Sequence, residues 1–433
     1  MKRPFVYIAV LLSTLFSYVE CRQWAAVLGG QDTTTQLPLI YGLGFESTTA
    51  TYISVPNTQG YINAAAMDSD GNAILVGTYN GDLPLIFRVA PGSTKAIPIT
   101  VPSTDMGSIN SVAIGPDGTA ILAGANSNGN ALIYSLAPGS LTTTTVATQS
   151  TNCFINSVAI GPDGTAILGG QQGAGPYPLI LKIAPGSTTA TLVTVPGTDV
   201  GWVNSVAIGP DNTAILGGVD DTTFLPLILS VAPGSNAATP ITSPATPDSF
   251  IIHVATGPDS TAILVGRDLT TMLPVVLRVA PGSSAATSIA VPLGTDNGYI
   301  DSVAIGSDGT AILGGTDTTS GAALIYSIAP GSSSASMITP LGTDMGIVYA
   351  VAVGSENTAF LGGQDNTTML PLIYILTAGS NSAMPVLSTF TDPGAFYAVA
   401  CLFPEGLYNI NRLRPIYNTQ LRETKAKLSQ AGL

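Results

Sequence analysis

Acidic residues recur in two kinds of polar segment along this chain. One kind follows a Leu-Gly-Gly-like step, as in Gln31-Asp32-Thr33-Thr34, and the other reads Thr-Asp-x-Gly, as at Asp199. Carboxylates, Thr hydroxyls and backbone carbonyls are the oxygen ligands that Ca²⁺ prefers. The candidate ligand- or cation-binding residues are Asp32, Asp105, Asp199, Asp220, Asp221, Asp268, Asp296, Asp317, Asp344 and Asp365. Calcium is the cofactor that this set suggests, but the sequence fixes no metal.

The same residues also have a purely structural interpretation. None of the segments has the spacing of an EF-hand loop, and Asp side chains commonly accept hydrogen bonds from backbone N–H groups two residues on. Turn formation therefore competes with ligand binding as their role. A second set of Asp residues, in Gly-Pro-Asp-Gly-like segments, is predicted to form turns: Asp117, Asp163, Asp211, Asp259 and Asp308.

A repeated unit positions all of these segments. An Ala-Ile-Leu-like step starts at Ala26, Ala73, Ala120, Ala166, Ala214, Ala262, Ala311 and Ala359, so the period is 46 to 49 residues. Each unit reads as four short strands separated by turn residues, most clearly in residues 155–196. Four antiparallel strands in about 48 residues, without helical periodicity, are typical of a β-propeller blade. A β-solenoid is the alternative, although its coils are usually shorter.

The two ends of the repeat complement each other. The chain enters a unit at its second strand, from Trp24, and residues 396–400 form a first strand without the rest of its unit. Pairing these two strands would close a ring and leave no large exposed sheet edge. The sequence therefore predicts an all-β fold over residues 22–405. This fold is an eight-bladed β-propeller of four-stranded blades, closed by pairing of the N-terminal strands with the C-terminal strand.

The VAIGPDGTAILGG core of the unit resembles bacterial propeller repeats of the YVTN and NHL type. In those repeats a strand, a turn like Ser-Pro-Asp-Gly and a second strand open each blade. The resemblance implies the fold and an extracytoplasmic binding or scaffold role, and it implies no particular reaction. Those families more often have six or seven blades, so eight units depart from their pattern.

Charge is distributed unevenly along the chain. Residues 23–405 carry 24 Asp and Glu against five Lys and Arg, a net charge of −19. This balance argues against nucleic-acid binding, which needs a basic surface, and is compatible with cations, sugars or a basic partner. After the N-terminus no apolar run reaches the roughly 18 residues of a membrane-spanning helix, so no further membrane span is expected.

The two ends of the chain differ from the repeats. Residues 1–20 are predicted to be a secretory signal peptide, cleaved after Ser17 or after Cys21, with a retained signal anchor as the alternative. Export to the periplasm, the cell surface or the medium is therefore expected. Residues 406–433 form a basic tail, expected to be partly helical from about Thr419. The tail either packs on the acidic body or docks a partner.

Three cysteines are present, and two of them fall near the ends of the ring. Alignment of both ends with the last complete unit puts Cys401 at the position of Val353 and Cys21 at that of Gly354. These positions are neighbours in a hairpin, so a Cys21–Cys401 disulfide is the candidate pairing. It would stabilise the ring by about 5 kcal/mol in the chain-entropy model. The alternative is that Cys21 leaves with the signal peptide and two free thiols remain.

Signals of catalysis are few. The single histidine, His253, stands in a strand where sister units carry Ser or Ala, which favours a structural role. No Gly-x-Ser-x-Gly or His-Glu-x-x-His motif occurs. The leading hypothesis is an exported, monomeric binding or scaffold propeller that presents an acidic loop face to a protein, small-molecule or glycan ligand. The alternatives are a metal-dependent lactonase-like or hydrolase-like enzyme and a multivalent carbohydrate-binding propeller.

Overall fold

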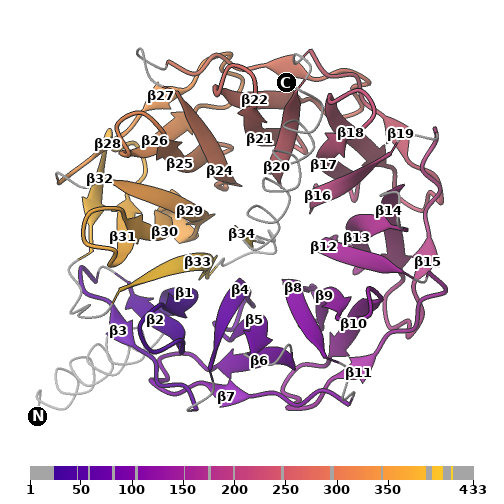
Figure 1. Ribbon diagram of the computed structural model, residues 1–433, viewed down its shortest axis with the longest axis horizontal. Coiled ribbons are helices and arrows are strands. Elements are labelled where there is room, and N and C mark those ends of the chain that lie inside the picture. The colour runs from indigo at the N-terminus through magenta and orange to yellow at the C-terminus, as the bar shows by residue number, and fades with distance from the viewer. Residues whose placement is uncertain are drawn as a thin grey trace, which may run out of the picture.

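The structure of the 433-residue chain is a computed structural model. It describes residues 24–45, 47–56, 59–79, 83–102, 106–150, 152–173, 177–197, 200–244, 248–292, 297–342, 345–386 and 393–402, and the backbone of residues 411–412. Eight antiparallel sheets are arranged around a central axis (Figure 1). The predicted eight-bladed propeller is therefore confirmed.

Each blade has a long inner strand and a very short outer one. The inner strands are β33 (Gly394–Cys401), β4 (Gly60–Met67), β8 (Gly107–Ile114), β12 (Cys153–Ile160), β16 (Gly201–Ile208), β20 (Ser249–Thr256), β24 (Gly298–Ile305) and β29 (Gly346–Val353). The second strands are β1 (Trp24–Asp32), β5 (Ala73–Tyr79), β9 (Ala120–Asn126), β13 (Ala166–Gln172), β17 (Ala214–Asp220), β21 (Ala262–Asp268), β25 (Ala311–Asp317) and β30 (Ala359–Asp365).

The third strands are β2 (Pro38–Gly44), β6 (Leu83–Val89), β10 (Ala131–Leu136), β14 (Tyr177–Ile183), β18 (Pro226–Val231), β22 (Pro274–Val279), β26 (Ala323–Ile328) and β31 (Pro371–Leu376). The outer strands are β3 (Thr51–Tyr52), β7 (Ile97–Pro98), β11 (Thr144–Thr145), β15 (Thr191–Leu192), β19 (Thr239–Pro240), β23 (Thr287–Ser288), β27 (Ser336–Met337) and β32 (Ser382–Pro385). We number the blades 1 to 8 from the one that contains β1.

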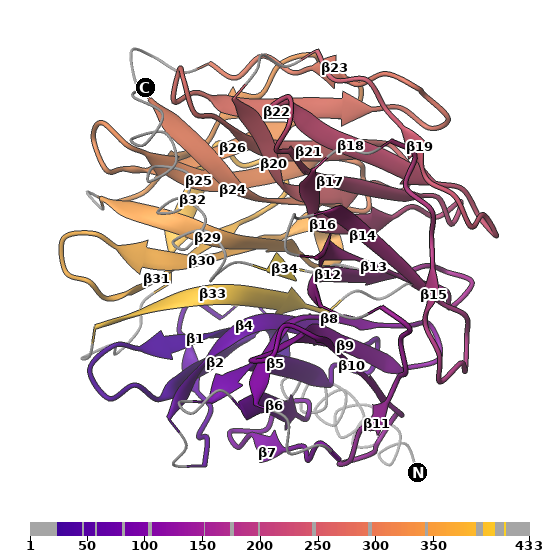
Figure 2. The same ribbon diagram turned by 45° about the vertical axis from the view of Figure 1, so that its right-hand side comes forward.

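Blade 1 is built from both ends of the ring, as the sequence predicted. The inner strand β33 pairs antiparallel with β1, from Ala26 opposite Cys401 to Asp32 opposite Gly394. All eight residues of β33 are buried. In both views β33 lies beside β1, although the two are separated by most of the chain (Figures 1 and 2). The closing strand therefore contributes buried side chains to the core as well as backbone hydrogen bonds to the sheet.

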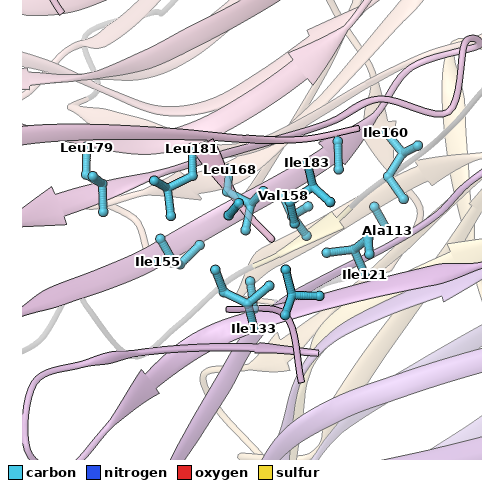
Figure 3. Close-up of a cluster of buried hydrophobic side chains, with 14 of the residues drawn as sticks. Ala113, Ile121, Ile133, Ile155, Val158, Ile160, Leu168, Leu179, Leu181 and Ile183 are labelled. Carbon is cyan, nitrogen blue, oxygen red and sulfur yellow. The ribbon is translucent and has the colours of Figure 1, made fainter. Parts of the chain in front are cut away.

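Apolar clusters lie between neighbouring blades. Between blades 3 and 4, Ile121 and Ile133 meet Ile155, Val158 and Leu168 (Figure 3). The first glycine of each Leu-Gly-Gly step permits this close approach. A Cβ on Gly169, for example, would lie 2.4 Å from Cγ1 of Val203 in the next blade. This explains why small residues alternate with Ile, Leu and Val in the repeat.

Polar side chains of the inner strands also join the blades. The Asn156 amide donates to the carbonyl oxygen of Val203 at 2.9 Å, and the Ser157 hydroxyl accepts the N–H of Val206 at 3.1 Å. The amides of Asn63, Asn110 and Asn204 and the hydroxyls of Ser111, Ser205 and Ser302 make equivalent bonds. The repeated Asn-Ser pair is therefore a structural link that runs from blade to blade.

Short parallel bridges link the outer rim. Ser54 pairs with Lys95, Thr100 with Thr142 and Ala147 with Thr189, and the pattern continues to β28 (Thr339–Pro340), which pairs with β32. In blades 2 to 8 the residues at or just before the outer strand are thereby paired with the segment that leaves the preceding blade. This arrangement protects the sheet edges, which would otherwise offer unpaired N–H and C=O groups.

The ends of the chain lie largely outside the described residues. The predicted signal peptide, the Cys21 position and the predicted tail helix fall there. The backbone of β34 (Asn411–Arg412) is described, and it pairs antiparallel with Ala64 and Ala65 on the inner strand β4. No helix in the part of the chain that the structure describes is long and apolar enough to cross a membrane.

Candidate functional site

The connections of the propeller divide between two faces. The Gly-Pro-Asp-Gly and Ala-Pro-Gly-Ser turns lie together, since a Cβ on Gly118 would lie 3.1 Å from Cγ of Pro138. We call this side the turn face. The loops between second and third strands and the loops between blades lie together at the other side, which we call the loop face. There, a Cβ on Gly129 would meet Asn152 and Phe154 of the next blade.

The turn face is uniform, and its carboxylates are turn formers. Asp163 accepts the N–H of Thr165 at 2.9 Å through one oxygen and the Thr165 hydroxyl at 3.0 Å through the other. Asp117, Asp211, Asp259 and Asp308 make the same pair of bonds with the Thr two residues on. The prediction for these five residues is confirmed.

Five of the candidate binding residues occupy one equivalent place on the loop face, at the end of the second strand. In blade 5, Oδ1 of Asp220 accepts the backbone N–H groups of Thr222 at 2.8 Å and Thr223 at 3.0 Å. The same oxygen of Asp32, Asp268, Asp317 and Asp365 accepts the N–H groups two and three residues on. Each carboxylate therefore holds its own loop.

Asp317 is the most strongly engaged of these carboxylates. It is 4% exposed, and its Oδ2 accepts the Ser320 hydroxyl at 2.7 Å in addition to the two backbone N–H groups. Burial raises the pKa of Asp317, but the hydrogen bonds from the Ser320 hydroxyl and from the N–H groups of Thr319 and Ser320 together outweigh this effect. The pKa therefore lies below its ordinary value. The group is consequently anchored in its ionised form.

Of the five remaining candidate carboxylates, the structure describes one. Asp221 is half-buried, and its N–H donates to the Val200 carbonyl at 2.6 Å, which ties the loop to the preceding inter-blade segment. Asp105, Asp199, Asp296 and Asp344 lie outside the described residues. Among the residues that the structure does describe, no group of three or more His, Cys, Asp or Glu side chains could hold a metal ion.

The structure describes only one of the two cysteines of the candidate disulfide. Cys401 is 4% exposed, and burial raises the pKa of its thiol well above the ordinary value. Its proposed partner, Cys21, lies outside the described residues, so the pairing stays a prediction. Cys153 is also buried, its thiol donates to the Ser150 carbonyl at 3.4 Å, and desolvation raises its pKa.

The loop face exposes large apolar side chains over several blades. Phe224 is 42% exposed and Met369 47% exposed, both at a loop position with positive φ. Others on this face are Leu83, Met106, Phe154, Tyr177, Leu273 and Met345. The large apolar residues that are exposed elsewhere lie mainly on the outer rim, such as Leu192 and Met384. Apolar side chains grouped on one face of a soluble protein commonly mark an interaction surface.

A second set of aromatic residues lies at the loop-face ends of the inner strands. The second residue of the inner strand is aromatic in blades 2 and 4 to 7, and we call these residues the aromatic collar: Tyr61, Phe154, Trp202, Phe250 and Tyr299. Phe154 is 37% exposed and the others are half-buried. This set was not among the candidates from the sequence, which were polar and acidic residues of the loops. The signal was an aromatic residue at the second position of the inner strand, which in Phe154 and Trp202 stands two places before the Asn-Ser pair.

One cation is built into the collar. The Arg267 guanidinium carbon lies 5.5 Å from the centroid of the Phe250 ring and 5.4 Å from that of Tyr299. Phe250 is the cross-strand partner of Arg267 in blade 6, whereas Tyr299 belongs to blade 7. Arg267 is only 4% exposed. We call these three residues the Arg267 clamp, a cation–π arrangement that spans two blades.

Trp202 carries a buried polar atom. Its indole Nε1–H is buried and meets no acceptor among the residues that the structure describes, although the side chain as a whole is half-buried. A buried donor without an acceptor is unusual and costs stability.

Comparisons with known proteins support the fold. No family model matches the sequence, and a search of curated proteins finds no match. Dipeptidyl peptidase 4 from Porphyromonas gingivalis is similar in structure, with a TM-score of 0.53 and 12% identity. The match covers 76% of this chain and 53% of the peptidase, so this chain spans about half its length.

A candidate 6-phosphogluconolactonase from Bacteroides uniformis is also similar, with a TM-score of 0.50, 12% identity, and coverage of 87% of this chain and 99% of the other. A structure of YCF48 bound to a D1 peptide has a TM-score of 0.49, 12% identity, and coverage of 72% and 92%. At such low identity the likenesses to the peptidase and to the candidate lactonase show the β-propeller fold alone. The finer YVTN or NHL assignment has no sequence match behind it.

Proposed function

We propose that this protein is an exported, monomeric binding module that takes a protein partner on its loop face. The observation that carries the proposal is that eight of the sixteen exposed large apolar side chains in the described residues lie on that face, whereas the turn face is made mainly of uniform Gly, Pro and Asp turns. Interface cores are enriched in aromatic residues and Met, as this face is. The signal-like residues 1–20 support export.

The sequence suggested that acidic residues bind the ligand, whereas the contacts of the described carboxylates favour binding through the apolar side chains of the same face. Because Asp32, Asp220 and their sister residues accept N–H groups of their own loops, a metal or ligand would have to compete with those bonds. Apolar contact by neighbouring side chains needs no such rearrangement. The lactonase-like and carbohydrate-binding alternatives have no specific observation in their favour.

A site-specific photo-crosslinker tests the proposal in cells of the natural source. A benzophenone amino acid would replace Phe224 on the loop face or, as a control, Leu192 on the outer rim, which is 57% exposed. We expect a discrete protein adduct from position 224 that is lost when Met272 and Leu273 are changed to Ser. No adduct from position 224, or the same adducts from both positions, would contradict a partner site on this face.

A further inference from the structure

The Arg267 clamp has a counterpart in the preceding pair of blades that lacks the cation. In blade 6, Phe250 pairs with Arg267, and Tyr299 of blade 7 completes the clamp. In blade 5, Trp202 pairs with Val219 in the same register, and Phe250 of blade 6 holds the place of Tyr299. Two aromatic rings thus recur, with an uncharged, short side chain at the position of the arginine.

We propose that Trp202 and Phe250 bind an arginine side chain of the partner protein, as Phe250 and Tyr299 hold Arg267. This inference rests on the proposed function, because it names the chemistry of the partner on the same face. Indole is the most favourable aromatic ring for a cation, and arginine is the more common cation in such contacts. Trp202 and Phe250 are both half-buried residues, so neither is fully covered by the propeller itself.

The charge of the propeller favours a basic partner. Residues 23–405 contain 24 acidic and five basic residues, and one of these five, Arg267, is already buried in its clamp. A positively charged segment would be attracted to this body before contact and would be held by the aromatic rings after it. An acidic partner would meet repulsion at long range.

The surroundings of Trp202 favour a peptide over a free cation. Phe224 lies beside the start of β20, because its carbonyl accepts the Ser249 N–H at 3.1 Å, and its side chain is 42% exposed. An arginine next to an apolar residue would engage the two aromatic residues and Phe224.

The position between blades 4 and 5 is less suitable. Phe154 and Trp202 are the aromatic residues there, but Gln171 is the cross-strand partner of Phe154. Gln171 is longer than Val219 and polar, so it occupies more of the place that Arg267 fills in blade 6. The Trp202–Phe250 pair is therefore the one that we assign to the partner.

The test measures binding of a fluorescein-labelled peptide of alternating Gly and Arg to the full-length protein by anisotropy. A peptide of alternating Gly and Glu is the charge control. The Val219→Arg variant should recreate the clamp internally and weaken binding of the Gly-Arg peptide by about tenfold. Gln364→Arg is the matched variant, since Gln364 holds the same register in blade 8 opposite Ile347, without an aromatic pair. It should bind as the wild type does.

Trp202→Leu is the second variant, in case Val219→Arg does not fold, and circular dichroism checks both. It should also lose about tenfold in affinity. Only two tryptophans are present and Trp24 is 8% exposed, so a change in intrinsic fluorescence on binding reports mainly on Trp202. Equal binding by wild type, Val219→Arg and Trp202→Leu would overturn the inference and indicate general attraction to the acidic body. Absence of peptide binding to the wild type would also overturn the inference. A crosslink at position 224 would still stand in either case.

Discussion

Nδ1 of His253 accepts the backbone N–H of Val303 in the next blade at 3.3 Å. The hydroxyls of Ser111, Ser157, Ser205 and Ser302 accept the corresponding N–H groups in other blades. The only histidine of the chain therefore replaces a serine in the link between blades. Its 5% exposure and its acceptor role support the structural interpretation that the sequence favoured.

This relationship predicts the outcome of two substitutions. His253→Ser should be more stable than His253→Ala by about 1 kcal/mol, because the Ser hydroxyl can accept the N–H of Val303, whereas both variants lose the buried imidazole ring. His253→Ala should lower the free energy of unfolding by about 2 kcal/mol, because the buried N–H of Val303 loses its acceptor. Urea denaturation followed by circular dichroism measures both, and equal stability of the two variants would contradict the acceptor role.

Asp317 provides a comparable test on the loop face. Asp317→Ala should cost about 2–3 kcal/mol, since the N–H groups of Thr319 and Ser320 lose their common acceptor. Asp317→Asn should cost about 1 kcal/mol, because Asn126 performs the same task in blade 3, where its Oδ1 accepts the N–H groups of Asn128 and Asn130. Denaturant unfolding ranks the two variants, and the opposite order would refute the turn-forming role.

The lowered pKa of Asp317 predicts how that stability depends on pH. A carboxyl whose pKa is lower in the folded than in the unfolded state stabilises the fold fully above the unfolded value, near 4. This contribution is lost as the pH falls through the folded pKa, which lies below 3.8. The stability difference between wild type and Asp317→Asn should therefore be constant from pH 7 to about pH 5 and shrink below pH 4.

Calcium should not stabilise the described loops. The Oδ1 atoms of Asp32, Asp220, Asp268, Asp317 and Asp365 already accept backbone N–H groups. We expect the same thermal unfolding midpoint in millimolar Ca²⁺ and in a chelator. A rise of several degrees would mean that other oxygen ligands bind the ion, and Asp105, Asp199, Asp296 and Asp344 would be the first residues to replace.

The cysteines predict a result by intact mass. In the native protein Cys153 and Cys401 should resist alkylation at pH 7, because both are buried and have raised pKa values. After denaturation without reductant, a mature chain that keeps Cys21 should show one alkylatable thiol. Three thiols in such a chain would exclude the Cys21–Cys401 disulfide, whereas a chain cleaved after Cys21 should show two.

Two truncations test the closure of the ring. A chain that ends at Ile410 keeps β33 and should unfold cooperatively, as the full chain does. A chain that ends at Pro393 lacks β33, whose eight buried residues pair with β1, and should lose cooperative unfolding. Thermal unfolding by circular dichroism compares the two. Retention of a native-like transition by the shorter chain would show that blade 1 does not need its C-terminal strand.

The sequence predicted the elements that depend on local periodicity. The recurring Ala-Ile-Leu step and the Gly-Pro-Asp-Gly segments define strands and turns within one unit, so the number of blades and the closing strand followed from counting. The turn role of Asp163 and its sisters followed from the same local rule. The structural use of His253 was predicted from its position in a strand, but its partner Val303 was not.

The tertiary structure decided what lies between blades. Arg267 and Tyr299 belong to neighbouring sheets, and their contact depends on how blade 7 packs against blade 6, which no spacing along the chain expresses. The same holds for the acidic loops, where the sequence allowed either ligand binding or turn formation. The folded loop of Asp220 commits the carboxylate to N–H groups two and three residues on. Local sequence sets hydrogen bonds within a turn, whereas contacts between side chains of different blades exist only once the ring has closed.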